Sequence, residues 1–291
     1  MRDDGRRPSA LYGYTLWVSA LTAVLGCAIL AGGFAAAWDT FGNVREYADR
    51  NIANEDSYYA YAEGSIEELA RIFFVVTPLL AVLALLVVSA LLGAYAVDAA
   101  HAAGDGRPLS SGELWRRSRR RLPAAFVVNA LTWSAVGAAE LTAYAWGYRA
   151  GRDDAAWADW LFPVAMACLG PLLYSRLVVA TAETVVGGRT PFAALYRSWV
   201  LTRRVRWRAL GVVVLVTAAA VLFVRLAMYA VAPLVHVAGL AMLRISDGNV
   251  WSTGVLMKVL PLGLALLLVP PVLLPGVCAM VTRLHRRLIR T

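Results

Sequence analysis

Six long apolar runs constrain this chain more than any other feature of its sequence. A helix needs about 20 apolar residues to cross the hydrocarbon core of a membrane, and each run is long enough. The runs cover residues 11–38, 72–97, 122–146, 157–182, 209–232 and 255–281. Charged residues make up only 16% of the chain and hydrophobic residues 60%, whereas soluble domains carry about 25% charged residues. The sequence therefore predicts an all-α fold, a polytopic six-helix transmembrane bundle forming one integral membrane domain, 1–291.

The fifth apolar run continues beyond its span to Leu243. Proline lacks a backbone donor and tends to end or kink a helix, so we expect Pro233 to end this span. Residues 234–243 would then form a short helix that lies in the outer interface or folds back into the membrane. The first run is too long for the apolar core of a cleavable signal peptide, so it is predicted to be a retained span.

The basic residues indicate the orientation, because cytoplasmic loops carry an excess of Lys and Arg. One side of the six spans holds 19 arginines, whereas the other holds six arginines and Lys258. The arginine-rich side comprises the N-terminal segment, residues 98–121, residues 183–208 and the C-terminal segment. Both termini are therefore predicted to be cytoplasmic. Among 28 basic residues there is one lysine, and this Arg- and Ala-rich composition is typical of high-GC bacteria, which places the chain in a bacterial cell membrane.

The outer loop, residues 39–71, is acidic and is the one sizeable segment predicted to lie outside the membrane. Ser65 and Glu68 have the spacing of a capping box, which predicts a helix start there. We interpret the loop as a solvated connector. The alternative is a docking surface for a partner on the outer side.

The two central cytoplasmic loops, 98–121 and 183–208, resemble each other. Each has a Gly-Arg turn, a proline, a short predicted helix with an Arg and a Ser, and a cluster of arginines. Ser110 and Glu113 form a predicted capping box, and Thr190 with Pro191 predicts a second helix start. An acidic residue, Asp98 or Glu183, precedes each loop. The chain is therefore predicted to consist of three helical hairpins related by an internal repeat.

The two loop helices combine aromatic residues with many arginines, which is typical of helices that lie on a membrane surface. The aromatic residues are Trp115, Phe192, Tyr196 and Trp199. An anionic leaflet attracts such a segment by about 1 kcal/mol per basic residue. The candidate contacts to anionic lipid or to a protein partner are Trp115, Arg116, Arg117, Arg197, Ser198 and Trp199. The alternative is that these arginines serve only to fix the topology.

The second of these loops is similar to a known family. Residues 176–183 read Arg-Leu-Val-Val-Ala-Thr-Ala-Glu, and Pro191, Arg197-Ser-Trp-Val-Leu-Thr202 and Trp207-Arg-Ala-Leu-Gly211 follow. This pattern resembles the membrane domain fused to some glycerophosphoryl diester phosphodiesterases, and its stand-alone actinobacterial relatives. The resemblance implies a helical membrane module without catalysis, because a separate soluble barrel carries out the reaction in the fused enzymes. This chain has no room for that barrel and lacks its metal-binding set.

Three charged residues lie deep within the apolar runs: Glu140, Arg176 and Arg225. Each costs about 2.5–3.5 kcal/mol at the centre of a span, so each is expected to face the bundle interior with a partner. Glu140 and Arg225 lie at similar depths in two spans of the same direction, so we predict that they pair or share a polar cavity. Arg176 and Glu183 are seven residues apart and are expected to share one helix face. Arg176 is expected either to reach the interface or to lie against the Arg197 helix. These residues are interpreted as helix-packing contacts, with a substrate path or a lipid headgroup site as the alternative.

No residue pattern predicts catalysis, a cofactor or a metal site. Cys27, Cys168 and Cys278 lie inside apolar runs, His236 is isolated, and no hydrolase or metalloprotease motif is present. The basic residues flank apolar runs rather than forming one soluble face, so no nucleic-acid partner is predicted. The favoured function is a non-catalytic scaffold or accessory module that engages anionic lipid or a protein partner. A transporter or export component is the first alternative, and an intramembrane enzyme acting on lipid or peptide is the second.

Overall fold

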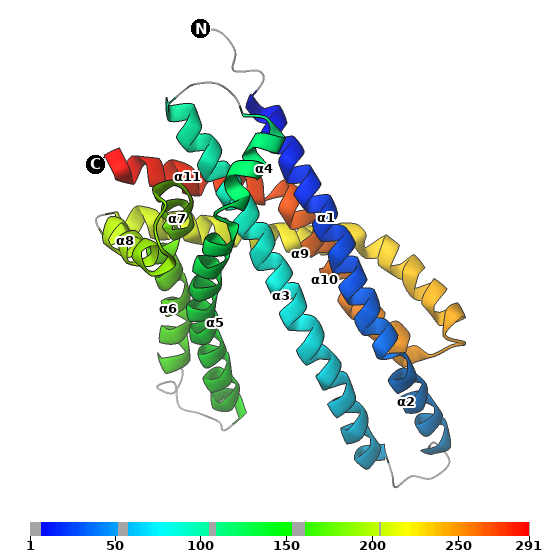
Figure 1. Ribbon diagram of the computed structural model, residues 1–291. Coiled ribbons are helices and arrows are strands. Elements are labelled where there is room, and N and C mark those ends of the chain that lie inside the picture. Colours follow the sequence, from blue (N-terminus) through cyan, green and yellow to red (C-terminus); the bar gives the residue numbers. More distant parts are fainter. Residues whose placement is uncertain (1–6, 52–57, 105–108, 153–160, 204, 291) are drawn as a thin grey trace. The chain divides into compact units, whose positions relative to one another are not determined.

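The computed structural model describes residues 7–51, 58–104, 109–152, 161–203 and 205–290, and within these ranges the chain forms helices joined by short turns, with no strand. The helices are α1 (Arg7–Ala36), α2 (Trp38–Asn51), α3 (Tyr58–Gly104), α4 (Ser111–Arg119), α5 (Leu122–Arg152), α6 (Leu161–Leu177), α7 (Ala180–Gly187), α8 (Pro191–Arg203), α9 (Arg206–Ile245), α10 (Val250–Val272) and α11 (Leu274–Arg290) (Figure 1). The predicted all-α fold is therefore confirmed.

Six stretches of the described residues are long and apolar enough to cross a membrane. They are Ala10–Glu46, Glu67–Ala102, Leu122–Arg149, Leu161–Gly187, Arg206–Ile245 and Val250–Val272. Each overlaps one of the six apolar runs of the sequence. The chain thus has the architecture of a multi-pass membrane protein with six spans.

The chain divides into two compact units, which are described separately. Unit 1 comprises Met1–Leu16, Leu85–Ala220 and Val272–Thr291, and unit 2 comprises Trp17–Ala84 and Val221–Pro271. The candidate lipid and partner contacts of the sequence all belong to unit 1, together with Glu140, Arg176 and Glu183. Arg225 belongs to unit 2.

Unit 2 is closed at one end by a tight turn between α9 and α10. Asp247 and Gly248 adopt positive φ angles of 52° and 81° in this turn. The side chain of Asn249 accepts hydrogen bonds from the backbone of Trp251 (3.0 Å) and Ser252 (3.2 Å), and so caps α10. Its amide nitrogen also donates to the Phe41 carbonyl of α2 over 2.9 Å. One asparagine therefore caps a span and attaches α2 to it.

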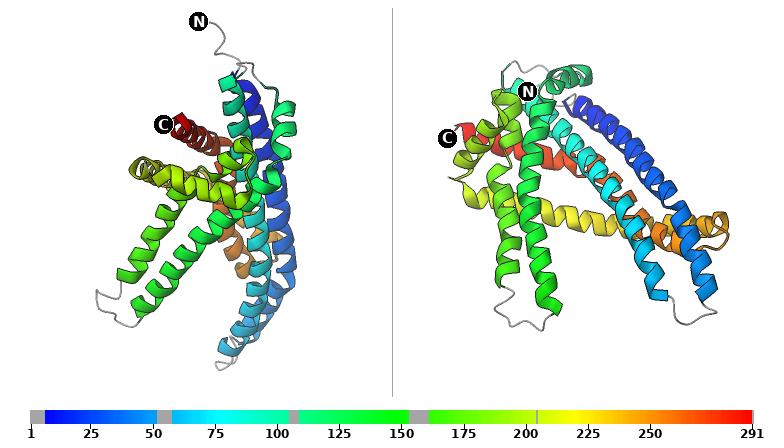
Figure 2. Two further views of the ribbon diagram at one scale, coloured as in Figure 1. Left: turned by 60° about the vertical axis from the view of Figure 1, so that its left-hand side comes forward. Right: turned by 60° about the horizontal axis from the view of Figure 1, so that its bottom comes forward.

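Unit 1 is built around the antiparallel pair α5 and α6, which lie side by side (Figure 1). The short helices α7 and α8 pack against α5 and against each other, across one end of this pair (Figure 2). The fully buried side chains of the unit include Leu91, Leu114, Val128 and Val179. This end of unit 1 carries the arginine-rich loops, so it is where the predicted lipid or partner contacts lie.

Several predicted helix ends are wrong. Pro233 does not end the fifth span, because α9 continues through it to Ile245. A proline inside a membrane helix is tolerated when its neighbours satisfy the freed carbonyl. The helix expected at Ser65 already begins at Tyr58, since extending an existing helix adds one hydrogen bond for each residue fixed. The outer segment 39–71 is accordingly mostly helical, and its residues 52–57 lie outside the described ranges.

The fourth and sixth predicted spans are each divided. The fourth, predicted over residues 157–182, is split between α6 and α7; its predicted first residues lie outside the described ranges. The sixth ends at Val272, and α11 starts at Leu274, where Pro275 suits the first turn of a helix. α11 buries Cys278, Thr282, His285 and Leu288 on one face and exposes arginines on the other. It is therefore an amphipathic helix separate from the span.

Candidate functional site

The break between α6 and α7 is held open by side chains of α8. α6 ends at Leu177 and α7 begins at Ala180, so the Arg176 carbonyl has no partner within its own helix. Ser198 Oγ donates to this carbonyl over 2.7 Å. Thr202 Oγ1 lies 3.2 Å from the same carbonyl, but its shorter hydrogen bond, 2.8 Å, is to the Ser198 carbonyl. Because a buried carbonyl needs a hydrogen-bond partner, the Ser198 hydroxyl caps α6 and fixes α8 against it, with Thr202 packed beside the same carbonyl.

A tight glycine turn leads from α7 into α8. Gly188 has a φ of +64° and ends α7 in the left-handed conformation that glycine adopts most easily. A Cβ at this position would lie 3.2 Å from Arg121 Nη2. α8 then starts at Pro191, with its first backbone bond from Ala194 to the Thr190 carbonyl (2.9 Å). The predicted start at Thr190 and Pro191 is therefore confirmed.

α8 has an inward face of small residues and an outward face of large ones. Ala194, Ser198 and Thr202 recur every four residues and are 0% exposed. The outward face consists of Phe192, Tyr196, Trp199, Val200 and Arg203, all exposed, with Phe192 and Tyr196 more than 70% exposed. This face carries three aromatic rings, of which Phe192 and Tyr196 are the most exposed.

Glu183 is a buried carboxylate that binds three cationic or ionisable groups from different segments. Its Oε2 lies 3.3 Å from Arg189 Nε and 3.2 Å from Arg197 Nε. Its Oε1 lies 3.0 Å from His285 Nε2 of α11. The exposed fraction of its side chain is 4%. The Glu183 cluster, comprising Glu183, Arg189, Arg197 and His285, thus ties the α7–α8 turn, α8 and α11 to α7.

His285 is neutral near pH 7 in this cluster. Burial lowers the pKa of His285, the positive charge of Arg197 acts in the same direction, and the Glu183 carboxylate acts against both. An ionised carboxylate can only accept hydrogen bonds, so Nε2 of the neutral ring carries the proton and donates it to Glu183. With two arginines and one carboxylate, the cluster then retains one net positive charge.

Arg176 lies against α8, the helix that carries Arg197, which was one of the two positions expected for it. Its guanidinium is 5.5 Å from the centre of the Trp199 ring, in a cation–π arrangement. The expectation that Arg176 and Glu183 share one helix face is wrong, because the break at Val178–Val179 lies between them. Glu183 binds the arginines of the next turn and helix instead.

A buried chain of polar side chains joins α3, α5 and α7 beside the cluster. Asn129 Nδ2 donates to Ser89 Oγ over 2.8 Å, and Thr181 Oγ1 donates to Asn129 Oδ1 over 2.8 Å. All three side chains are buried. Hydrogen bonds of this kind hold helices together in a membrane, where apolar contacts alone provide little drive for association. Sequence analysis did not single out Asn129, because an isolated polar residue in an apolar run has no spacing signal.

α4 presents charge rather than aromatic rings. The predicted capping box is confirmed: Ser110 Oγ accepts from the Glu113 backbone (3.3 Å), and the Ser110 backbone donates to the Glu113 carboxylate (3.1 Å). The Ser110 backbone bond lowers the pKa of Glu113, and the Ser110 hydroxyl adds to this effect. Leu114 and Ser118 are buried, Trp115 is half-buried, and Arg116, Arg117 and Arg119 are exposed. α4 and α8 therefore differ in surface chemistry, although both bury a serine four residues after an apolar residue.

Only some of the predicted contact residues lie on the outer surface. Ser198 is fully buried and Arg197 contacts Glu183, so these two position α8 rather than form its outer surface. Trp199, Arg116 and Arg117 are exposed, as a contact surface requires. Phe192 and Tyr196, which the sequence indicated as aromatic residues of this helix without counting them among the contacts, belong to the same exposed surface of α8.

The predicted Glu140–Arg225 pair stays a prediction, because the two residues belong to different units. The Glu140 carboxylate lies directly against Gly170 of α6, where it would collide with any Cβ. Its side chain and that of Arg225 are both exposed on their own units.

Fold and site together define an all-α, multi-span membrane protein whose first unit carries a buried carboxylate cluster and an exposed aromatic helix. No protein-family model, curated protein or solved structure matched the chain.

Proposed function

We propose that this chain is a non-catalytic multi-span module of a bacterial cell membrane, with both termini in the cytoplasm. In this proposal α4 and α8 lie on the inner leaflet and engage anionic lipid headgroups, so that the module serves as a scaffold or accessory component. The membrane domain associated with glycerophosphoryl diester phosphodiesterases, to which residues 176–211 are similar, would be a module of the same kind.

The outward face of α8 is the observation that carries this proposal. Phe192, Tyr196 and Trp199 project from a short helix that joins two spans. Aromatic side chains are enriched at the level of the lipid headgroups, where the ring is partly apolar and the surroundings are partly wet. Arg203 and Arg206 follow these rings and are exposed. The aromatic rings that would anchor α8 in the interface are thus followed directly by arginines that would bind the charged headgroups.

α4 contributes the second group of charges. Its exposed Arg116, Arg117 and Arg119 are followed by exposed Arg120 and Arg121. Each basic residue near an anionic surface contributes about 1 kcal/mol to binding. The two helices therefore favour an anionic over a zwitterionic headgroup.

Native mass spectrometry of the protein released from mixed bilayers tests this proposal. We would purify it from phosphatidylcholine and phosphatidylglycerol bilayers and count the lipids of each class that stay bound. The wild-type protein should retain phosphatidylglycerol preferentially. A variant carrying Arg116→Gln, Arg119→Gln and Arg203→Gln should lose this preference by at least about fivefold, which corresponds to about 1 kcal/mol.

The matched control removes basic residues predicted to lie on the opposite side of the membrane. Arg149→Gln, Arg244→Gln and Lys258→Gln also neutralise exposed cations, but they should leave the preference unchanged. An equal loss in both variants would show that net charge, and not α4 and α8, selects the lipid. If a protein stays bound instead and only the first variant releases it, the arginine-bearing helices engage a protein partner and the lipid proposal is wrong.

A further inference from the structure

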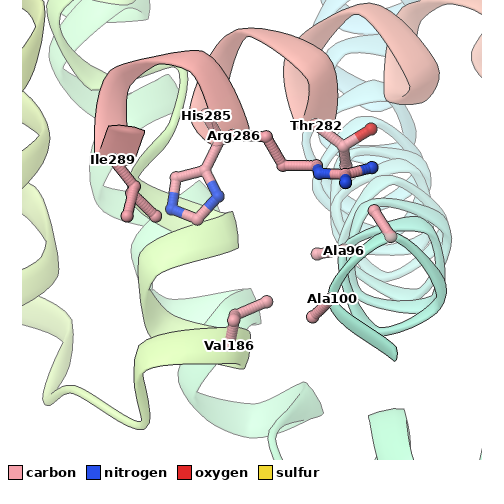
Figure 3. A pocket seen from close by; sticks show the side chains of 8 residues that line it. Ala96, Ala100, Val186, Thr282, His285, Arg286 and Ile289 are labelled. Carbon is pink, nitrogen blue, oxygen red and sulfur yellow. The ribbon is translucent and has the colours of Figure 1, made fainter. Parts of the chain in front are cut away.

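Unit 1 contains a cavity of about 190 Å³ between the end of α3, α7 and α11. It is lined by Ala96, Ala99, Ala100, Val186, Thr282, His285, Arg286 and Ile289 (Figure 3). None of these residues belongs to α4 or α8. A ligand here would therefore be a function beyond the proposed membrane contact of those two helices.

The walls of the cavity differ in chemistry. The three alanines of α3, Val186 of α7 and Ile289 of α11 are apolar, and the polar groups all come from α11. The Arg286 guanidinium extends from α11 toward the α3 wall near Thr282, and the His285 ring borders the same space (Figure 3). One side of a small apolar space is thus cationic.

Arg286 has no ion-pair partner among the residues that the structure describes, and no acidic residue lines the cavity. The nearest buried carboxylate, Glu183, is already shared by two arginines and His285. An arginine presents a planar fork of donors that matches a carboxylate or a phosphate. The cavity therefore has a fixed positive charge that an anionic ligand would neutralise.

We propose that this cavity binds the acid group and first carbon atoms of an anionic amphiphile, an alkyl carboxylate or alkyl phosphate, with Arg286 as its counterion. The apolar walls require a hydrocarbon stem beside the acid group, because a bare ion would lose its hydration there without gaining further donors. The volume sets the size, since a cavity of about 150 Å³ holds a benzene-sized group. A stem of a few carbons fits, and a longer chain must leave through the open side.

Calorimetric titration of the full-length protein in a non-ionic detergent tests this site with four probes. Hexanoate and hexyl phosphate both carry an acid group on a stem, and their relative affinity distinguishes a fatty-acid source from a phosphate-ester source. Hexanol has the stem without the charge, and inorganic phosphate has the charge without the stem. We expect both hexyl acids to bind at least tenfold more tightly than hexanol or inorganic phosphate.

Variants assign the binding to this cavity. Arg286→Gln should weaken hexanoate binding by about tenfold or more, since it removes one charge-assisted hydrogen bond. The neighbouring Arg287→Gln is the matched control, because Arg287 is exposed on the same helix and does not line the cavity; it should bind as the wild type does. Ala100→Leu should abolish binding by filling the space, while all charges remain.

Three results would overturn the proposal. If hexanol binds as tightly as hexanoate, the cavity is an apolar pocket that does not recognise the acid group. If inorganic phosphate binds as tightly as hexyl phosphate, the site binds anions without recognising the alkyl stem. Equal losses for Arg286→Gln and Arg287→Gln would place the binding elsewhere. If Arg286→Gln does not fold, the four probes on the wild type and the Ala100→Leu variant still decide the question.

Discussion

At the scale of single residues, Glu183 is the most consequential side chain in unit 1. It is buried, and its one carboxylate is shared by Arg189 and Arg197 while it accepts a hydrogen bond from His285. Removing one partner of a buried ion pair leaves the other charge uncompensated, which costs about 3–5 kcal/mol in a dry interior. The two arginines are about two-fifths exposed, so solvent reduces this cost.

We predict that Glu183→Gln lowers the free energy of unfolding by about 2 kcal/mol. Thermal unfolding in detergent, followed by tryptophan fluorescence, measures the change. Glu67→Gln is the matched control: Glu67 pairs with Arg71 over 3.9 Å, but both side chains are more than 75% exposed. An exposed pair contributes at most about 1 kcal/mol. Equal effects of the two substitutions would contradict the central position given to Glu183.

His285 makes the stability of the Glu183 cluster depend on pH. Burial lowers the pKa of His285 in the folded protein below the ordinary value of 6.5, so below pH 6.5 the ring binds more protons in the unfolded chain than in the folded one. Stability must then be complete above pH 6.5 and decrease as the pH falls below it. The groups facing the ring are Glu183, Arg197 and Arg286, and carboxyl groups titrate mostly near pH 4.

We therefore predict that the melting temperature of the wild type is lower at pH 5.5 than at pH 7.5. His285→Gln should remove most of that difference, because the substituted side chain has no proton to gain. His236→Gln, at an exposed histidine, should keep it. Melting curves of the three proteins at both pH values check this, and a pH dependence that survives His285→Gln would assign it to another group.

At the scale of elements, the α7–α8 turn decides where α8 lies. Gly188 adopts a φ of +64°, and a Cβ there would also approach Arg121. We predict that Gly188→Ala destabilises the protein by about 1 kcal/mol or more. Gly112→Ala is the control, because nothing lies within 4 Å of its Cβ position and alanine adopts the helical backbone of the first turn of α4 without strain. Thermal unfolding should separate the two variants; a neutral Gly188→Ala would contradict the strained turn.

The sequence predicts those helix ends that are set by residues close together in the chain. The capping box at Ser110 and Glu113 and the start of α8 at Pro191 follow from residues within one turn of each other, and both are confirmed. The break between α6 and α7 could not be predicted in this way. Residues 176–183 contain no glycine or proline, and the partners of the freed carbonyl lie more than 20 residues away on α8.

At the scale of the whole molecule, composition and apolar run length were sufficient to predict the class of fold. Each of the six runs corresponds to a helical stretch that could cross a membrane. The Glu183 cluster could not be predicted from the sequence, because His285 lies 102 positions from Glu183. No spacing rule relates two residues so far apart in the chain. The sequence indicated Phe192 and Tyr196 as aromatic residues of an interfacial helix, but it did not show that they face outward, because this depends on which side of α8 packs against α6.

We propose that α8 lies in the membrane interface with its aromatic face toward the lipid. Spin-label depth measurement tests it most directly. A label at Ala193→Cys, an exposed position beside Phe192, would be compared with one at Leu131→Cys, an exposed position within a span. Both would be made in a variant with Cys27, Cys168 and Cys278 replaced by alanine. In bilayers containing phosphatidylglycerol, the label at position 193 should lie at the boundary between headgroups and acyl chains, shallower than that at 131. Full accessibility of position 193 to a water-soluble relaxing agent would contradict the account.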